Sequence, residues 1–392
     1  MQADYALVGG GLQNGLIALA LEADRPAARI VMIERGDAPG GNHTWCFHAG
    51  DLDAGQRAWI DPLVVARWEG YDVAFPGHRR TLASPYAAVS SRRFAAELSR
   101  SLARPGSKLI TRATAIEVEA QRVVIRHADG TLEQVRATAV IDARGPDAGP
   151  PSACGWQKFL GQELRLAAPH GLVRPMLMDA TVPQLGGFRF FYVLPLAPDR
   201  VLVEDTYFSD GTHVDATALR AEIAAHVAER GWQIAAVERE EVGVLPLPWQ
   251  CAPPASPPLG TAFVAGYAGG WFHPVTGYSF PIAARLASLV AALPAAQLIG
   301  PELAEHAAAH ARQMRFALRL NHMLFRWFPP EQRFHVLERF YRLPESLIRR
   351  FYTLELTGLD RARILIGRPP RGMSYRAALG IRSLAPSHSE AG

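Results

Sequence analysis

YALVGGGLQNGLIALALEADRPAARIVMIE, residues 5–34, decides the fold of this chain. An apolar run that ends in three glycines is followed by a helix-forming run and by a second apolar run that ends in an acid. Gly9 permits a tight turn after the first strand, and Gly11 lets the backbone approach a pyrophosphate at the helix N-terminus. Glu34 is placed to accept hydrogen bonds from an adenosine ribose. This order predicts a Rossmann-type dinucleotide-binding unit.

The third glycine of the usual fingerprint is replaced in this chain. Asn14 stands at its position, and Gly15 follows directly. The third glycine normally allows close packing of the helix on the strand, so this departure is expected to loosen that packing. We include both residues among those predicted to form the cofactor site.

Two later glycine-rich turns favour FAD over a nicotinamide cofactor. Residues 139–145 (AVIDARG) read as a buried strand ending in a turn, where we expect Asp142 to have a turn-forming role. Residues 262–266 form another such strand, and a turn follows before the helix expected over 280–291. That turn supplies the remaining predicted cofactor-binding residues: Gly266, Gly269, Gly270, Thr276 and Gly277. Flavoproteins of the hydroxylase type use such a turn to bring a helix N-terminus to the flavin and pyrophosphate.

The expected fold class is α/β: an FAD-binding Rossmann-type flavoprotein, aromatic-hydroxylase-like, with an inserted β-rich substrate lobe and a helical C-terminal region. A chain of 392 residues exceeds the size at which one hydrophobic core usually stops growing. Residues 1–150 and 258–300 are predicted to form the FAD-binding lobe, with 46–88 partly on the substrate side. Residues 151–257 are assigned to the substrate lobe and 301–392 to the helical region.

The location of the protein is predicted from its cysteines and hydropathy. Its three cysteines share no short spacing, which argues against a disulfide framework and indicates a reducing cytoplasm. The first residues lack the basic region of a signal peptide, and no run of 18 apolar residues could cross a membrane.

Residues 312–371 are more basic than the rest of the chain. They contain 13 arginines against 5 acidic residues, and the first 41 of them carry nine aromatics: Phe316, Phe325, Trp327, Phe328, Phe334, Phe340, Tyr341, Phe351 and Tyr352. This composition is typical of a surface that lies on anionic lipid headgroups, and a solvated arginine-rich helical face is the alternative. We therefore predict peripheral attachment to the inner face of the cell membrane. No motif for nucleic-acid binding is visible, and none is expected.

Several motifs resemble those of the bacterial lycopene β-cyclases that close both ends of their substrate. They are residues 11–18, 40–45, 161–163, 175–182, 187–190, 202–206, 271–279 and 339–344. The resemblance runs from about residue 5 to about residue 370, and the family shares the asparagine at position 14. It implies conversion of lycopene to β-carotene through γ-carotene. The family's FAD must be reduced, with NAD(P)H as the electron source, although the reaction is an isomerisation without net redox change.

Such a cyclisation needs a carboxylic acid that is kept neutral by burial, together with aromatic faces that stabilise a carbocation. The hairpin of residues 188–206, turning at 198–199, is the expected source. Glu204 and Asp205 must point to opposite faces of their strand, so only one can enter the cavity. The family motif assigns the acid to Glu204, with Asp205 as a support or a solvated residue.

Other side chains are weaker candidates for this chemistry. His273 is a secondary candidate for proton movement. Four aromatic residues are candidates for facing the cation, with plain core packing as the alternative: Phe190, Tyr192, Trp271 and Phe272.

Two pairs of histidines invite functional readings that we do not favour. His43 and His48, with Cys46 between them, match no common zinc spacing, so no metal site is expected. His306 and His310 are expected on a solvated helix face.

Two other functions are considered for this chain. An FAD monooxygenase of the aromatic-hydroxylase type has the same expected fold. A non-catalytic flavin- or carotenoid-binding protein would need no acid in the cavity, and the Glu204 hairpin speaks against it.

Overall fold

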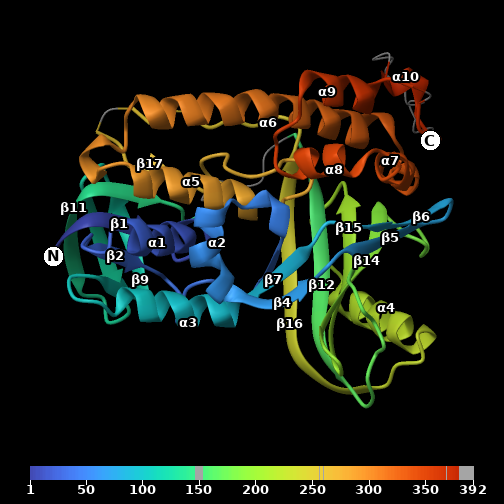
Figure 1. Ribbon diagram of the computed structural model, residues 1–392, viewed down its shortest axis with the longest axis horizontal. Coiled ribbons are helices and arrows are strands. Elements are labelled where there is room, and N and C mark those ends of the chain that lie inside the picture. Colours follow the sequence, from blue (N-terminus) through green and yellow to red (C-terminus); the bar gives the residue numbers. More distant parts are fainter. Residues whose placement is uncertain (146–152, 256, 259, 368, 379–392) are drawn as a thin grey trace, which may run out of the picture.

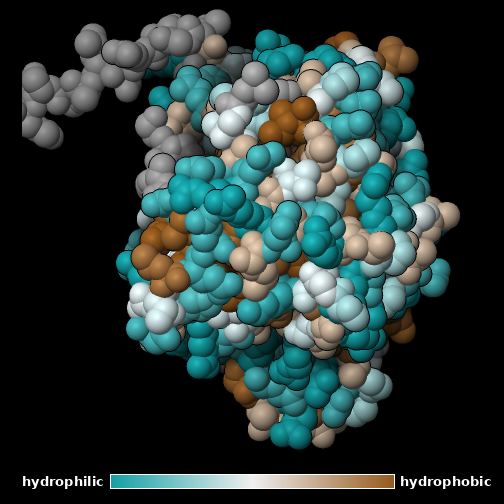
Figure 2. Space-filling view, turned by 90° about the vertical axis from the view of Figure 1, so that its left-hand side faces the viewer, coloured by the Kyte–Doolittle hydropathy of each residue, from teal (hydrophilic) through white to brown (hydrophobic). Residues whose placement is uncertain are grey.

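The computed structural model describes residues 1–145, 153–255, 257–258, 260–367 and 369–378. Two large sheets lie side by side, and a layer of helices runs along one side of both (Figure 1). Hydrophilic residues cover most of the face at the N-terminal end of the molecule, and exposed hydrophobic areas there are scattered (Figure 2).

The first sheet is built on the N-terminal strand. Its strand order is β8-β2-β1-β11-β10-β9, and β17 pairs with β11. β1, β2, β8, β11 and β17 run parallel, whereas β10 pairs antiparallel with both β11 and β9. The strands are β1 (Gln2–Val8), β2 (Ile30–Ile33), β8 (Lys108–Ile110), β9 (Ala113–Val118), β10 (Arg122–His127), β11 (Leu132–Asp142) and β17 (Phe263–Val264). The predicted strand, glycine turn, helix and strand are therefore confirmed.

Helix α1 (Leu12–Asp24) packs against α5 (Phe280–Ala292) and α3 (Ser91–Leu102). At Gly15 an added Cβ would lie 2.1 Å from the ring of Phe94, so glycine allows α1 to approach α3 closely. Asn14 Nδ2 donates to the main-chain oxygens of Val8 and Gly9 at 2.9 Å. The expected loosening of α1 on the strand is thus wrong, because Asn14 itself binds the end of β1, and Gly15 instead allows close packing on α3.

The second sheet has the order β16-β12-β15-β14-β13-β5-β6. Its strands are β5 (Tyr71–Phe75), β6 (His78–Leu82), β12 (Cys154–Leu166), β13 (Met176–Asp179), β14 (Phe188–Ala197), β15 (Arg200–Ser209) and β16 (Ile234–Pro248). Helix α4 (Ala216–Glu229) packs its apolar side chains on one face of this sheet, and the other face belongs to the main core.

Residues 44–90 connect the two sheets. They contribute β5 and β6 to the second sheet and also form a separate three-stranded sheet of β3 (Thr44–His48), β7 (Tyr86–Ser90) and β4 (Val64–Trp68). Helix α2 (Ala54–Ile60) begins with a capping box between Asp53 and Gln56. Short 3₁₀ turns complete the fold: η1 (Ala49–Asp51), η2 (Asp61–Leu63), η3 (Ala295–Gln297) and η4 (Pro330–Gln332).

The C-terminal region is helical, as predicted. It comprises α6 (Pro301–Trp327), α7 (Phe334–Phe340), α8 (Glu345–Tyr352), α9 (Gly358–Leu365) and α10 (Tyr375–Ala378). Figure 1 shows α6 running along the outer side of α5, with α7 to α10 over the end of the second sheet. The expected lobe boundary at residue 150 and the end of the helical region at 392 lie outside the described residues.

Most aromatic rings of this helical region belong to the core. The buried ones are Phe316, Phe325, Phe328, Phe340, Tyr341, Phe351 and Tyr352, and Trp327 and Phe334 are partly covered. The helices turn these rings inward because burying them removes a large apolar area from water. The expectation that these rings form a membrane-facing surface is therefore wrong for the buried ones. The outward side of α6 carries arginines instead.

Candidate active site and cofactor groove

A groove of about 560 Å³ opens at the carboxyl ends of β1 and β2. Five of the predicted cofactor-binding residues line it, namely Gly9, Gly11, Glu34, Gly266 and Gly277. They come from the β1–α1 turn, the end of β2 and the long turn after β17. The structure thus brings together residues that are more than 240 positions apart in the sequence.

The groove has the features that a bound dinucleotide requires. An added Cβ on Gly11 would meet nothing within 4 Å, and no side chain caps the start of α1 at this residue. Backbone N–H groups at such a helix start favour a pyrophosphate. The Glu34 carboxylate is fixed by the N–H groups of Gly10 and Gly36, both at 2.7 Å. Within the described structure, the buried Oε1 of Gln13 has no hydrogen-bond partner. These residues fit FAD.

The other predicted cofactor residues lie behind the groove or beside it. Asp142 forms an ion pair with Arg144 at 2.7 Å and accepts its backbone N–H, so it shapes the turn after β11. Gly269 and Gly270 close the turn after β17, where a Cβ on Gly269 would lie 2.2 Å from a main-chain oxygen. Thr276 lines the neighbouring cavity rather than the groove.

Sequence reasoning missed several residues of the groove as site residues. They include Gln13, Arg35, His43, Thr44, Trp45, Thr114, Arg144, Glu241, Gly243 and Ser279. The motif at 40–45 contributes to the groove and was the available signal for three of them. Glu241 belongs to β16, and only the register of the second sheet places that strand here, so no local pattern could have indicated it.

A second cavity of about 220 Å³ adjoins the groove. Both are lined by Thr44, Trp45, Phe159, Glu241, Leu245, Gly277 and Ser279, so the two spaces meet. The cavity is rich in aromatic rings: Trp45, Tyr86, Phe159, Phe190, Tyr192, Phe208, Tyr278, Phe280 and Tyr352. Such faces stabilise a nearby positive charge.

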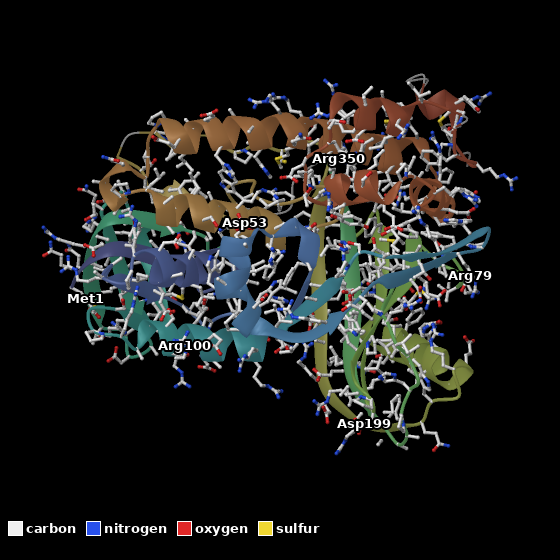
Figure 3. The ribbon with its side chains drawn as sticks, in the orientation of Figure 1. Met1, Asp53, Arg79, Arg100, Asp199 and Arg350 are labelled. Atoms are coloured by element: carbon white, nitrogen blue, oxygen red, sulfur yellow. The ribbon has the colours of Figure 1, made fainter. Side chains whose placement is uncertain are left out.

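Glu204 projects into this aromatic cavity. It lies directly opposite Tyr192 in the β14–β15 hairpin, whose far end is marked by Asp199 in Figure 3. Burial raises the pKa of Glu204 to about 8, and the charge of Glu241 adds to this, whereas the Thr206 hydroxyl opposes it by donating a hydrogen bond at 2.6 Å. At neutral pH Glu204 is therefore mostly protonated and able to donate a proton.

Asp205 points to the other face of the sheet. Its side chain is fully buried and accepts two hydrogen bonds from Arg189, each 2.9 Å long. Arg189 also contacts Glu222 of α4 at 2.8 Å. Burial raises the pKa of Asp205, while the bonds from Arg189 counteract that rise. Of the two alternatives for Asp205, the solvated residue is wrong, and the arrangement is that of a support.

His273 does not reach the aromatic cavity. Its Nε2 is 2.9 Å from the main-chain oxygen of Phe351, and its Nδ1 accepts the N–H of Val275 at 3.2 Å. Burial lowers the pKa of His273 to about 3. With both ring nitrogens bound to the backbone, His273 holds the turn to α8 and is not placed to move a proton in the cavity.

Trp271 and Phe272 follow the core-packing alternative, and His310 differs from its expected solvated position. Trp271 and Phe272 do not line the Glu204 cavity; Trp271 borders the groove, and Phe272 packs with Met314 and Leu318. His306 and His310 stack on Trp271, so the solvated helix face was wrong for His310, which is buried.

His43, Cys46 and His48 are the residues at which a metal site was considered and not expected. Within the described residues no group of three or more histidines, cysteines or acids could hold a metal ion. His48 instead packs among tyrosines at the edge of the aromatic cavity.

The fold is shared with solved flavoproteins of low sequence identity. A geranylgeranyl bacteriochlorophyll reductase-like protein from Thermoplasma acidophilum superposes with a TM-score of 0.63, 13% identity and coverage of 93% of this chain and 96% of that one. A probable FAD-dependent monooxygenase from Pseudomonas aeruginosa superposes with a TM-score of 0.60 and 16% identity. The match covers 85% of this chain and 98% of that one. A p-nitrophenol 4-monooxygenase from Pseudomonas putida superposes with a TM-score of 0.62 and 16% identity. The match covers 94% of this chain and 100% of that one. The fold is that of the aromatic-hydroxylase class of flavoproteins.

Sequence comparison is more specific than the fold. The model of the family described as lycopene cyclase protein matches residues 4–378. Lycopene beta-cyclases from Pseudescherichia vulneris and Pantoea ananas are each 43% identical to this chain. The first match covers 96% of this chain and 97% of the relative, and the second covers 94% of this chain and 95% of the relative. A lycopene beta-cyclase from a Paracoccus species is 40% identical over 94% of this chain and 95% of its own length. The chain belongs to the lycopene cyclase family.

Proposed function

We propose that this protein is a lycopene β-cyclase that converts lycopene through γ-carotene to β-carotene. The observation that carries the proposal is Glu204, a carboxylic acid in an aromatic-lined cavity that opens to the cofactor groove. Family membership supports the same reaction, since its named relatives are lycopene beta-cyclases.

Glu204 is assigned the role of general acid. Its O–H bond breaks as a C–H bond forms at the terminal double bond of lycopene, which leaves a tertiary carbocation. The neighbouring double bond attacks that cation and closes the ring. The Glu204 carboxylate then takes a ring proton, which leaves the ring double bond and restores the acid. Protons and electrons balance, so the product is an isomer of the substrate.

The cavity supports a reaction at one end of the substrate at a time. An apolar cavity of about 150 Å³ can hold a benzene molecule. The space beside Glu204, about 220 Å³, therefore suits one ring-sized end group and not the whole C40 chain. The rings of Phe190 and Tyr192 line it beside Glu204 and are the proposed cation-facing aromatics. A one-ended product is the expected intermediate.

The cofactor is proposed to be FAD in its reduced form, with NAD(P)H as the electron source. Gly9, Gly11 and Glu34 would hold its pyrophosphate and ribose, and Gly277 and Ser279 border both the groove and the cavity. Reduced FAD held in the groove would supply negative charge that favours a developing cation. Asp205 is proposed to support the hairpin through Arg189, and His273 to hold its turn.

Peripheral attachment to the inner face of the cell membrane is proposed for α6. Arg312, Arg315, Arg319 and Arg326 are exposed on one face of this helix and form no ion pair within the described residues. Beside them lies a mostly apolar groove that includes Trp249, Leu318, Met323 and Trp327. Unpaired arginines next to apolar side chains suit anionic headgroups. No helix among the described residues is long and apolar enough to span a bilayer.

The direct test is the carotenoid profile of a lycopene-accumulating bacterium that expresses this chain. The expected result is β-carotene with γ-carotene as a transient species. Purified enzyme should form many product molecules for each electron pair and should consume no oxygen. A monooxygenase would instead use oxygen and NAD(P)H in proportion to an oxygenated product, and unchanged lycopene would contradict the proposal.

A further inference from the structure

A row of directly opposed residues crosses the second sheet at Glu204. Tyr192, Glu204, Gly161 and Glu241 lie in register on β14, β15, β12 and β16. Residues opposite one another on neighbouring strands point to the same face of a sheet, so both glutamates face the same space. Both line the aromatic cavity. Their Cα atoms are two strand spacings apart, roughly 9.5 Å.

Gly161 leaves the space between the two glutamates open. A Cβ added to this residue would lie 3.4 Å from the Cβ, the Cγ and the Oε2 of Glu204. The strand between the two acids therefore contributes no side chain on this face. No side chain stands between the two acids, and inside the protein their charges are screened less than in bulk water, so the charge on one glutamate acts on the other.

Glu241 is held in place by a cation on its own strand. Arg239 Nη1 lies 2.6 Å from its Oε2, and His43 Nδ1 lies 3.8 Å from its Oε1. Arg239 is fixed in turn by Glu163 at 3.3 Å and by the side chains of Asn42 and Thr44. Only 6% of Glu241 is exposed. The ion pair with Arg239 holds the Glu241 side chain at the junction of the groove and the cavity.

We propose that Glu241 is a positioning residue of the cyclisation site, whose negative charge keeps the proton on the Glu204 carboxyl group until the substrate takes it. The same charge favours return of a ring proton to Glu204, because two facing carboxylates repel each other. This inference rests on the proposed function.

The other polar and charged groups around Glu204 do not replace this effect. They are Thr206 and Asp205 on its own hairpin, Arg239 on β16, and the cavity-lining residues Cys46, Tyr86, Tyr192, His48, Tyr278 and Tyr352. Burial is the largest cause of the raised pKa of Glu204, and the charge of Glu241 is the next. The Asp205 charge is a smaller contribution from the other face of the sheet.

The test compares Glu241→Gln with Glu240→Gln across pH in the FAD-loaded enzyme. Glu240 is the adjacent residue, points to the opposite face, and pairs with Arg220 at 2.7 Å, so its variant loses the same charge away from the cavity. Two unit charges separated by roughly the 9.5 Å spacing of the two Cα atoms, at an effective dielectric constant of about 20, would interact enough to shift a titration by roughly one pH unit.

The pH at which the rate declines should be lower by that amount in Glu241→Gln and unchanged in Glu240→Gln. For Glu241→Gln, the ratio of its rate at about pH 9 to its own rate near pH 6 should be roughly tenfold lower than the same ratio for wild type. Glu241→Asp keeps the charge and should restore most of the profile. An unchanged pH of decline in Glu241→Gln, or an equal shift in Glu240→Gln, overturns the proposal.

A second measurement separates this inference from the proposed function. Infrared difference spectra of the holoenzyme, referenced to Glu204→Gln, report the protonation of Glu204 without turnover. That titration should also move to lower pH in Glu241→Gln. If no variant forms a ring at any pH while the titration still moves, the proposed function fails and the coupling of the two glutamates holds. A titration that does not move overturns the coupling.

Discussion

Glu204 and Asp205 are chain neighbours with opposite surroundings. One faces an aromatic cavity with a hydroxyl as its hydrogen-bond donor, and the other is buried against the guanidinium of Arg189. Strand alternation alone predicts that they point apart. It does not predict the cation that binds Asp205, because Arg189 lies across the hairpin and could be assigned only with the register in hand.

The buried pair predicts what Asp205→Asn will do. Removing one charge from a buried ion pair leaves the other without its partner, which commonly destabilises a protein by about 3–5 kcal/mol. Glu222 still contacts Arg189, so we expect the lower end of that range. Chemical denaturation should show the loss, while cyclisation per folded enzyme stays within a few-fold of wild type. Asp199→Asn, at the exposed turn of the same hairpin, is the matched control and should change neither.

Cyclisation should decline as pH rises through about 8. The pKa of Glu204 is raised from 4.5 to about 8, and the general acid must carry its proton to react. The folded state therefore binds more protons than the unfolded state between these values, and this group's contribution to stability also falls as pH rises. Initial rates on liposomal lycopene, with bound FAD quantified at each pH, check this. A rate that rises through pH 8 would contradict the assignment.

Two nearby glycines of the nucleotide-binding unit, one at the start of α1 and one within it, serve different purposes. Gly11 borders open space in the groove, whereas Gly15 is packed against Phe94. We predict that Gly11→Leu folds with nearly wild-type stability but loses the flavin spectrum, because the side chain fills the pyrophosphate position. Gly15→Leu should instead destabilise the fold, because α1 and α3 cannot approach. Thermal melts and FAD content measure both, and a flavin-loaded Gly11→Leu protein would refute the site.

How far the sequence predicts each element depends on whether the signal is local. The strand–turn–helix–strand unit is encoded within thirty residues, and the structure confirms it. The role of β16 is not locally encoded, since Glu241 reaches the cavity only through pairing with β12. The location of the aromatic residues after position 312 was predicted wrongly for a related reason. Composition fits a surface or a core equally well, and helix packing places most of these rings in the core.

At the scale of the whole molecule, the arginine face of α6 predicts how the enzyme meets its substrate. Lycopene has almost no concentration in water, so it must come from a bilayer. Each arginine near an anionic surface contributes about 1 kcal/mol. The triple variant Arg312→Gln, Arg315→Gln, Arg319→Gln should therefore bind anionic vesicles on the order of a hundredfold more weakly, and added salt should weaken wild-type binding.

The control for that experiment removes three exposed arginines on other elements. Arg57, Arg79 and Arg92 lie on α2, β6 and α3 and form no ion pair within the described residues, and Arg79 is labelled in Figure 3. Their combined change to Gln should leave vesicle binding nearly unchanged. Equal wild-type binding to neutral and anionic vesicles, insensitive to salt, would contradict electrostatic attachment through α6.

We propose that Glu204 delivers the proton that closes the ring. The decisive measurement is the β-carotene formed from lycopene in liposomes with reduced flavin by folded, FAD-loaded Glu204→Gln, beside wild type and Asp205→Asn. The glutamine keeps the shape of the acid but cannot donate its proton, so the rate should fall about 10²- to 10⁴-fold while FAD binding survives. Near-wild-type cyclisation by Glu204→Gln, with Asp205→Asn inactive, would show that the acid is on the other face of the strand.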